Sequence, residues 1–227
     1  MLDVFAQTGA AGFEQFLLLG LVMGSLYALI ALGYTMVYGI IELINFAHGD
    51  LFMLGSFLAL GVAIQLGVTT AASSTGAVVG AVALMLVTAP LACAALNVAT
   101  DRVIYRPLRS APKLTVIVSA IGVSFVFMNV GSLWLGTSPV KFPDLVPDAN
   151  LVTAAGVRFT WKDLMVVGVT VPTMVALTLF VKFTPLGKAM RATAQNPTAA
   201  KLMGINVDRV IAVTFAIGGS LAGVAAV

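Results

Sequence analysis

The chain has 227 residues, of which 60% are hydrophobic and only 9% are charged, and its formal net charge is +3. A soluble domain carries about 25% charged residues, so this composition cannot cover a globule with hydrated side chains. The basic residues form no tract or aromatic-interleaved patch of the kind that binds nucleic acid, and a single cysteine excludes an internal disulfide. The composition favours an integral membrane protein.

Charge-free runs in the sequence predict six membrane-spanning helices. A helix needs roughly 20 mainly apolar residues to cross a bilayer, and runs of this kind recur along the chain. We therefore expect an all-α, polytopic membrane protein with a single domain over residues 1–227, in which residues 1–15 form a short polar lead. The predicted spans are residues 16–40, 46–66, 77–99, 114–135, 164–182 and 209–227.

The Lys and Arg residues predict the orientation, because basic residues near span ends concentrate on the cytoplasmic side. The loops after the third and the fifth predicted spans are strongly basic, whereas the segment 136–163 balances basic with acidic side chains. We therefore expect both basic loops to be cytoplasmic, and the segment 136–163 and the N-terminus to be external. The basic residues of the two loops are Arg102, Arg106, Arg109, Lys113, Lys182, Lys188, Arg191, Lys201 and Arg209.

The second basic loop, residues 184–208, carries signals for a short helix. Pro185 and Gly187 are expected to break the helix before them. Asn196 is a favourable N-cap, and the proline that follows it suits the first helical position, where its missing N–H costs nothing. Gly204 is placed to end this helix in a left-handed C-cap. The sequence predicts a rigid helix over about 197–203, at the membrane surface, as a contact for something outside the membrane.

The motif from Glu42 to Asp50 brings polar residues to the start of the second span. Only 16 residues run from Leu51 to Leu66, too few to cross a core of roughly 30 Å, so the span must begin within the motif or be interrupted. Asn45, His48 and Asp50 then lie near membrane depth, where they either face a pathway or stay in the headgroup layer, with Asn45 or Asp50 capping the helix. His48 is disfavoured as a metal ligand because the chain has no second histidine and its cysteine is distant.

Three further polar or small residues carry expectations. Asn129 lies well inside the fourth span and should hydrogen-bond a neighbouring helix, which we favour, or face a water-filled path. Asp208 is expected to cap the sixth span, and Cys93 is expected to be a packed small residue. The sixth span ends at Val227 without a flanking charge, so we expect the domain to be incomplete at its C-terminus.

Four stretches, read together, resemble the permease subunit of the branched-chain (hydrophobic) amino acid ABC transporter family. They are Gly-Ser-Leu-Tyr at the start of 24–39, Ile-Asn-Phe-Ala-His-Gly-Asp at the start of 44–55, Arg-Val-Ile-Tyr-Arg-Pro-Leu-Arg at 102–109, and Ala-Thr-Ala-Gln-Asn-Pro at the start of 192–211. The resemblance implies a multi-pass protein of the bacterial plasma (inner) membrane that imports branched-chain or other hydrophobic amino acids. It also implies three kinds of partner besides the lipid bilayer: a second permease subunit, two cytoplasmic ATP-binding subunits and an external substrate-binding protein. ATP and magnesium would be bound by the ATP-binding subunits, with no cofactor in this chain.

The resemblance also assigns candidate residues. The family's contact with the ATPase maps onto 184–208, where the candidate coupling residues are Gly187, Arg191, Asn196, Pro197, Ala200, Leu202 and Gly204. The candidate residues of the translocation pathway are Asn45, His48, Asp50 and Asn129.

The sequence also leaves other functions open. Relatives within the family carry urea or short amides, and the sequence does not separate them from amino acid carriers. An ATP-independent channel or carrier would need charges inside the spans for ion coupling, and the central predicted spans have none. A membrane-embedded enzyme could use Glu42, His48 and Asp50 for acid–base chemistry, but the sequence offers no nucleophile or metal to act with them.

Overall fold

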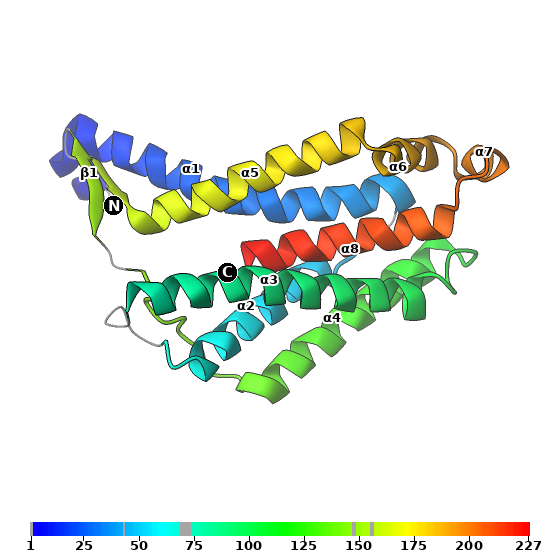
Figure 1. The fold of residues 1–227 in the computed structure, drawn as a ribbon, viewed down its shortest axis with the longest axis horizontal. Helices are drawn as coiled ribbons and strands as arrows, with labels where there is room; N and C mark the ends of the chain where they lie inside the picture. The colour runs from blue at the N-terminus through cyan, green and yellow to red at the C-terminus, as the bar shows by residue number, and fades with distance from the viewer. Residues whose placement is uncertain (1, 43, 69–73, 147–148, 155–156) are drawn as a thin grey trace.

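The computed structural model describes residues 2–42, 44–68, 74–146, 149–154 and 157–227, and it is a bundle of long helices (Figure 1). Within these residues, six helices are long and apolar enough to cross a membrane, which confirms the predicted number. The six helices are α1 (Leu2–Ile41), α2 (His48–Gln65), α3 (Thr75–Thr100), α4 (Lys113–Leu135), α5 (Trp161–Phe183) and α8 (Val207–Ala225).

Shorter elements connect these helices at the two ends of the bundle. The π-helical turn η1 (Asp101–Tyr105) continues α3, and α6 (Pro185–Gln195) and α7 (Pro197–Leu202) join α5 to α8. A two-stranded antiparallel hairpin, β1 (Asn150–Ala154) and β2 (Val157–Thr160), lies at the opposite end (Figure 1). We call these two ends the loop end, which carries α6, α7 and η1, and the hairpin end.

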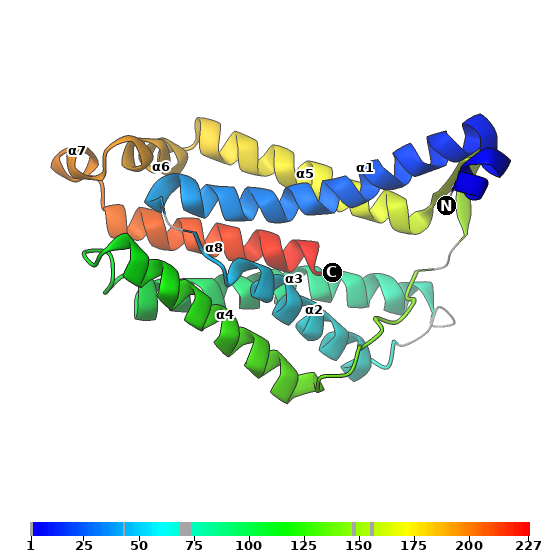
Figure 2. The same ribbon diagram turned by 180° about the vertical axis from the view of Figure 1, so that it is seen from behind.

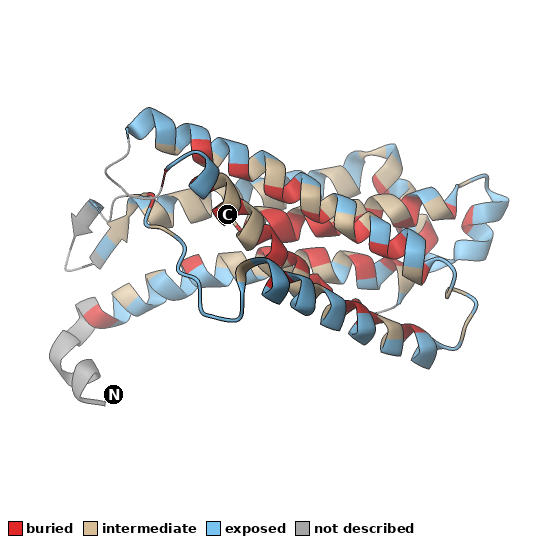
Figure 3. Cartoon of the chain, turned by 90° about the horizontal axis from the view of Figure 1, so that it is seen from below, coloured by how far each residue is buried: buried red, intermediate tan, exposed pale blue. Residues whose placement is uncertain are grey.

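The helix at the centre of the bundle is α8, which has the largest buried share of the six (Figure 3). It packs against α3, α1 and α2, and its contact with α3 depends on glycine. A Cβ atom on Gly219 would lie 2.5 Å from the carbonyl oxygen of Cys93, and one on Gly223 would lie 2.5 Å from Cα of Pro90. Small residues let helix backbones approach this closely inside a membrane. Cys93 is fully buried, as predicted, and its Sγ donates to the carbonyl oxygen of Leu51 at 3.3 Å.

The loops between successive spans lie at alternate ends of the bundle, as the sequence predicts. The helices run alternately up and down the bundle, so that both basic loops lie at the loop end (Figures 1 and 2). The second span begins at His48, within the polar motif, as the length argument required. However, the residue before this helix is Ala47 and no side chain caps it, so the alternative in which Asn45 or Asp50 acts as the cap is wrong.

Three other local expectations also need correction. Residues expected to form a polar lead belong to α1, which begins at Leu2. Asp208 lies in the first turn of α8 rather than capping it, because the side chain of Asn206 accepts the backbone N–H of Arg209 at 3.0 Å. The segment 136–163 contains the hairpin, an addition to the expected all-α fold. The hairpin is attached to α1, because Gln15 donates to the carbonyl of Arg158 and accepts from its N–H.

Candidate functional site

The elbow between α5 and α6 is built on a glycine and a threonine. Thr184 caps α6, with its Oγ1 accepting the N–H of Gly187 at 3.0 Å, and Pro185 occupies the first helical position. Gly187 lies against the end of α5, where a Cβ atom would collide with the carbonyl oxygens of Phe180 and Val181. The expected break is confirmed, because α5 ends at Phe183, and Pro185 and Gly187 also begin a new helix.

Arg191 fixes α6 to α5. Its guanidinium donates to the carbonyl oxygen of Val181 and, at 3.4 Å, to that of Lys182. These carbonyls belong to the last turn of α5, which has no further helical N–H to bind them. Arg191 thus acts as a side-chain cap of α5, and its hydrogen bonds hold α6 against the end of that helix.

The predicted helix 197–203 is present as α7. Asn196 caps it, with Oδ1 accepting the N–H of Ala199 at 3.0 Å, and Gly204 follows it with a φ of +83°. Ala200 is buried against the bundle, whereas Leu202 and Met203 on the opposite side are 85% and 82% exposed. Large apolar side chains this exposed, beyond the ends of the spans, form a surface suited to a protein contact.

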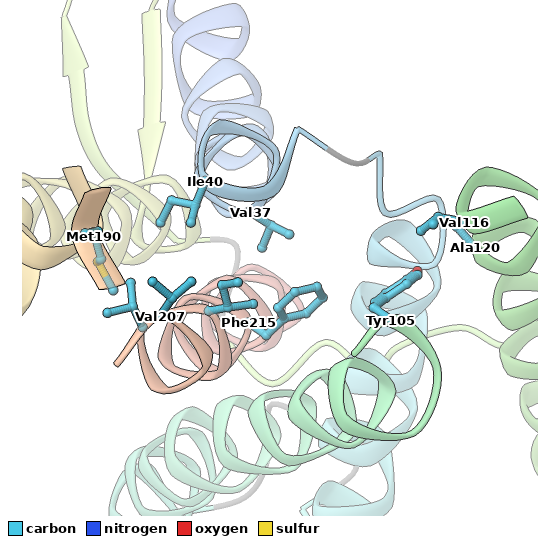
Figure 4. Packing of buried hydrophobic residues seen from close by; sticks show 11 residues of the cluster. Val37, Ile40, Tyr105, Val116, Ala120, Met190, Val207 and Phe215 are labelled. Atoms are coloured by element: carbon cyan, nitrogen blue, oxygen red, sulfur yellow. The ribbon is translucent and has the colours of Figure 1, made fainter. Parts of the chain in front are cut away.

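A buried apolar cluster carries contacts from α6 to the core. Met190 of α6 lies with Val37 and Ile40 of α1 and with Val207 and Phe215 of α8 (Figure 4). In this cluster, the ring of Tyr105 lies 5.5 Å from the ring of Phe215, between centroids. The loop end is therefore packed through to α8 rather than attached by a flexible strand of chain.

An ionic cluster joins the start of α8 to η1. Arg109 donates to Asp101 at 2.7 Å and to Asp208 at 2.5 Å, and Arg106 donates to Asp208 at 2.9 Å. The side chain of Asp101 is only 2% exposed. A buried carboxylate needs such a partner because desolvation penalises an unpaired charge heavily. Since α8 follows α7 directly, this cluster ties the α7–α8 junction to the end of α3.

A buried network of neutral polar groups lies next to the ionic cluster and shares the turn η1 with it. Tyr105 donates to Oδ1 of Asn45 at 2.8 Å, and Asn45 donates to Oδ1 of Asn97 at 3.2 Å. Asn97 in turn donates to the carbonyl oxygen of Phe215 at 2.7 Å. This network connects the segment before α2 with η1, α3 and α8. Asn45 is thus a structural link, and its amide is occupied by the protein.

His48 and Asp50, in the first turn of α2, have separate surroundings. His48 is 1% exposed, and its ring meets that of Tyr34 edge-on at 6.1 Å, next to Gly33. Among the described residues, neither of its nitrogens has a hydrogen-bond partner of normal geometry. Asp50 is half-buried and accepts a hydrogen bond of 2.5 Å from Ser124 of α4.

The other sequence candidates are not gathered at one point. Asn129 is exposed on α4 and donates to the carbonyl of Phe125 in its own helix, so the expected bond to a neighbouring helix is absent from the described residues. Glu42 forms an exposed ion pair with Lys113 at 3.2 Å. Glu42, His48 and Asp50 therefore each have a different neighbour, and the arrangement assembles no acid–base constellation from them.

Sequence reasoning missed four residues of the site: Asp101, Arg109, Asn97 and Tyr105. In the sequence, the positive-inside pattern accounts for Arg109 and the end of a helix accounts for Asp101. Neither explanation indicates that the two residues form an ion pair. A signal for Asn97 was available, because an amide near the end of an apolar span requires a partner.

At the hairpin end, Lys162 hydrogen-bonds Asp144 and lowers the pKa of this exposed carboxyl.

Comparison with known proteins places this arrangement in a family. Residues 16–227 match the family described as the branched-chain amino acid transport system / permease component. The high-affinity branched-chain amino acid transport system permease protein LivH of Salmonella typhimurium is 39% identical in an alignment that covers 95% of this chain and 70% of the relative. The corresponding protein BraD of Pseudomonas aeruginosa is 41% identical, over 94% of this chain and 69% of the relative. No solved structure matches. The chain is a multi-pass membrane protein that belongs to the branched-chain amino acid transport permease family.

Proposed function

We propose that the chain is the membrane-spanning permease subunit of an ATP-driven importer. It moves branched-chain or other hydrophobic amino acids delivered by an external binding protein, and it works with a second permease and two ATP-binding subunits that hold ATP and magnesium. The names of the relatives support the transport of branched-chain amino acids. The single observation that carries the coupling is that α7 presents an exposed apolar surface while its other side is packed, through α6 and the ionic cluster, onto α8.

The geometry supports a route by which a push on α7 reaches the membrane interior. Gly187 and Arg191 fix α6 to α5, and Asn196, Pro197, Ala200 and Gly204 define α7 and its packing. Leu202 is the coupling candidate that faces outward. Displacement of the α7–α8 junction would reach Asp101 and η1 through Arg109 and Asp208. Single π-helical turns are frequent at functional sites, which fits η1 to this role.

The pathway assignments remain proposals and differ in support. His48 is the strongest of the four, because its buried ring has no hydrogen-bond partner of normal geometry in the described part of the chain and could take a polar ligand or water once α8 moves. Asp50 is already bound to Ser124, and Asn45 to Asn97 and Tyr105, so these two act first as structural links. Asn129 would contribute only if the exposed face of α4 lines the path.

Disulfide trapping tests the ATPase contact in the assembled complex. Cys93 is replaced by Ser, a single cysteine is placed at the exposed Ala199, and the ATP-binding subunit carries a cysteine on its membrane-facing groove. We expect trapping that changes with ATP. The matched control is a cysteine at the exposed Ala149, at the hairpin end, which should not trap. A loop-end cysteine that labels with a soluble thiol reagent but never traps would contradict the proposed coupling.

Uptake measurements separate the importer from its alternatives. Leucine uptake that stops on ATP depletion supports the importer, whereas uptake that ignores ATP depletion indicates a channel or secondary carrier. Competition by urea or a short amide, with no competition by valine or isoleucine, would move the substrate to the amide-carrying branch of the family.

A further inference from the structure

A groove at the loop end runs between α3 with η1 on one side and the start of α8 on the other. It has a volume of about 470 Å³, and its two ends differ in chemistry. One end of the groove lies nearer the loops and is lined by Arg102, Arg106 and Arg209. The other, which we call the inner end, lies nearer the middle of the helices and is lined by Val98, Ala212, Val213 and Ala216. The route from α7 to the core does not use Arg102 or Arg209.

The charges around the groove do not balance. Four guanidinium groups, those of Arg102, Arg106, Arg109 and Arg209, face the two carboxylates of Asp101 and Asp208. Arg109 and Arg106 already satisfy both carboxylates, so the excess of two positive charges resides on Arg102 and Arg209. Neither of these two forms an ion pair with another described residue.

The position of the groove along the spans matches the boundary between headgroups and acyl chains. The apolar span that includes α3 and η1 ends at Tyr105, and the span of α8 begins at Val207, so the arginines lie at the membrane surface. Val98 and Ala216 are seven and nine residues inside these limits, about 10 to 14 Å deeper at the helical rise of 1.5 Å per residue. The groove is therefore cationic at headgroup level and apolar at acyl-chain level.

We propose that this groove binds an anionic phospholipid, with its phosphate diester at Arg102 and Arg209 and one acyl chain along Val98, Ala212, Val213 and Ala216. Basic pockets between membrane helices bind lipid headgroups in this way, and anionic lipids are concentrated in the cytoplasmic leaflet, where the loop end is predicted to lie. An acidic surface of a partner protein would match the arginines alone. It would leave unexplained why the groove continues into the depth of the membrane with an apolar lining.

Native mass spectrometry tests the proposal. The protein is extracted from its own membrane in the assembly in which it occurs. Phosphatidylglycerol and phosphatidylcholine are titrated separately against the wild type and the variants Arg102→Gln and Arg209→Gln. We expect preferential binding of phosphatidylglycerol, weakened about fivefold by loss of each guanidinium. Arg102→Lys and Arg209→Lys, which keep the charge, should retain most of this binding. Lys113→Gln, which removes one exposed charge at the same end outside the groove, is the matched control and should change it little.

A second variant tests the apolar half without touching the charges. Ala216→Leu fills the inner end of the groove and should reduce binding of phosphatidylglycerol while leaving the arginines in place. Equal binding of the two lipids, or an equal loss in Lys113→Gln, would overturn the proposal. Displacement of the lipid by inorganic phosphate or glycerol phosphate at the same concentrations would instead indicate a site for free anions. Unchanged lipid binding with loss of the co-purifying ATP-binding subunit would indicate a protein contact, and the lipid proposal would be wrong.

Discussion

Asp101 and Arg109 form an ion pair of 2.7 Å in which the carboxylate is buried and the guanidinium also reaches the first turn of α8. The pair lies where α3 changes from α-helical to π-helical geometry. Asp101 is thus both the first residue of the irregular turn and the point at which that turn is attached to the α7–α8 junction. The stability of the loop end should depend on this pair more than on any exposed pair in the described chain.

Replacing Arg109 with Met should strongly destabilise the protein. The change leaves a buried carboxylate without its partner, which costs about 3–5 kcal/mol of unfolding free energy. The measurement is denaturant unfolding in mixed micelles, followed by circular dichroism. Lys113→Met breaks the exposed pair with Glu42 and should cost no more than about 1 kcal/mol. Equal losses in the two variants would contradict the assignment, and adding Asp101→Asn to Arg109→Met should recover much of the loss.

Replacing Gly219 with Ala should separate α8 from α3. The new Cβ atom would lie 2.5 Å from the carbonyl oxygen of Cys93, and backbone cannot move aside as a flexible side chain can. We expect a loss of about 1–3 kcal/mol, as in other overpacked interiors, measured by the same unfolding assay. Gly122→Ala is the control, because a Cβ atom there meets nothing within 4 Å, and it should be neutral or stabilising. A Gly219→Ala protein as stable as Gly122→Ala would show that the two backbones are not in close contact.

Replacing Tyr105 with Phe removes one hydroxyl from the buried network and little volume. The buried Oδ1 of Asn45 loses its donor, so unfolding free energy should fall by about 1–3 kcal/mol. Tyr27→Phe provides the control, because Tyr27 is 71% exposed and should be insensitive. If the polar network also serves the route from α7 to the core, Tyr105→Phe should lower the number of substrate molecules moved per ATP hydrolysed. Identical stability of the two variants would place the Tyr105 hydroxyl outside the network.

Replacing Asn196 with Ala should loosen α7 without affecting membrane insertion. The side chain accepts the N–H of Ala199, and loss of an N-cap costs about 1 kcal/mol of helix stability. Faster amide hydrogen exchange within 197–202, together with reduced ATP-dependent uptake, is the expected result. Thr198→Ala alters a neighbouring exposed residue that caps nothing and should exchange as the wild type does. Normal uptake despite faster exchange would show that coupling does not need an ordered α7.

The parts of the fold that could be predicted depend on signals close together in the sequence. The spans follow from the absence of charge, and α7 follows from Asn196, Pro197 and Gly204, which act on backbone groups within a turn of themselves. The start of α2 within the polar motif followed from length alone. Such local signals do not require knowledge of what the rest of the chain does.

The site could be predicted only in part, because its contacts join residues far apart in the sequence. Asn45 and Asn97 are 52 residues apart, and Arg109 and Asp208 are 99 apart. No periodicity specifies such partners. The break before α6 was predicted but α6 itself was not, because a proline can end one helix or begin the next, and the cap by Thr184 decides that a new helix begins.

The glycine face of α8 has a mechanical consequence. Interlocked side chains resist the sliding of one helix along another, and small sliding motions between packed helices are an established mode of conformational change. At Gly219 and Gly223 the surface of α8 toward α3 has no side chains to interlock. Its start, by contrast, is latched to Arg109 through Asp208. Sliding of α8 along its own axis is therefore the motion that its packing against α3 opposes least, and the ion pair of Asp208 holds only its first turn.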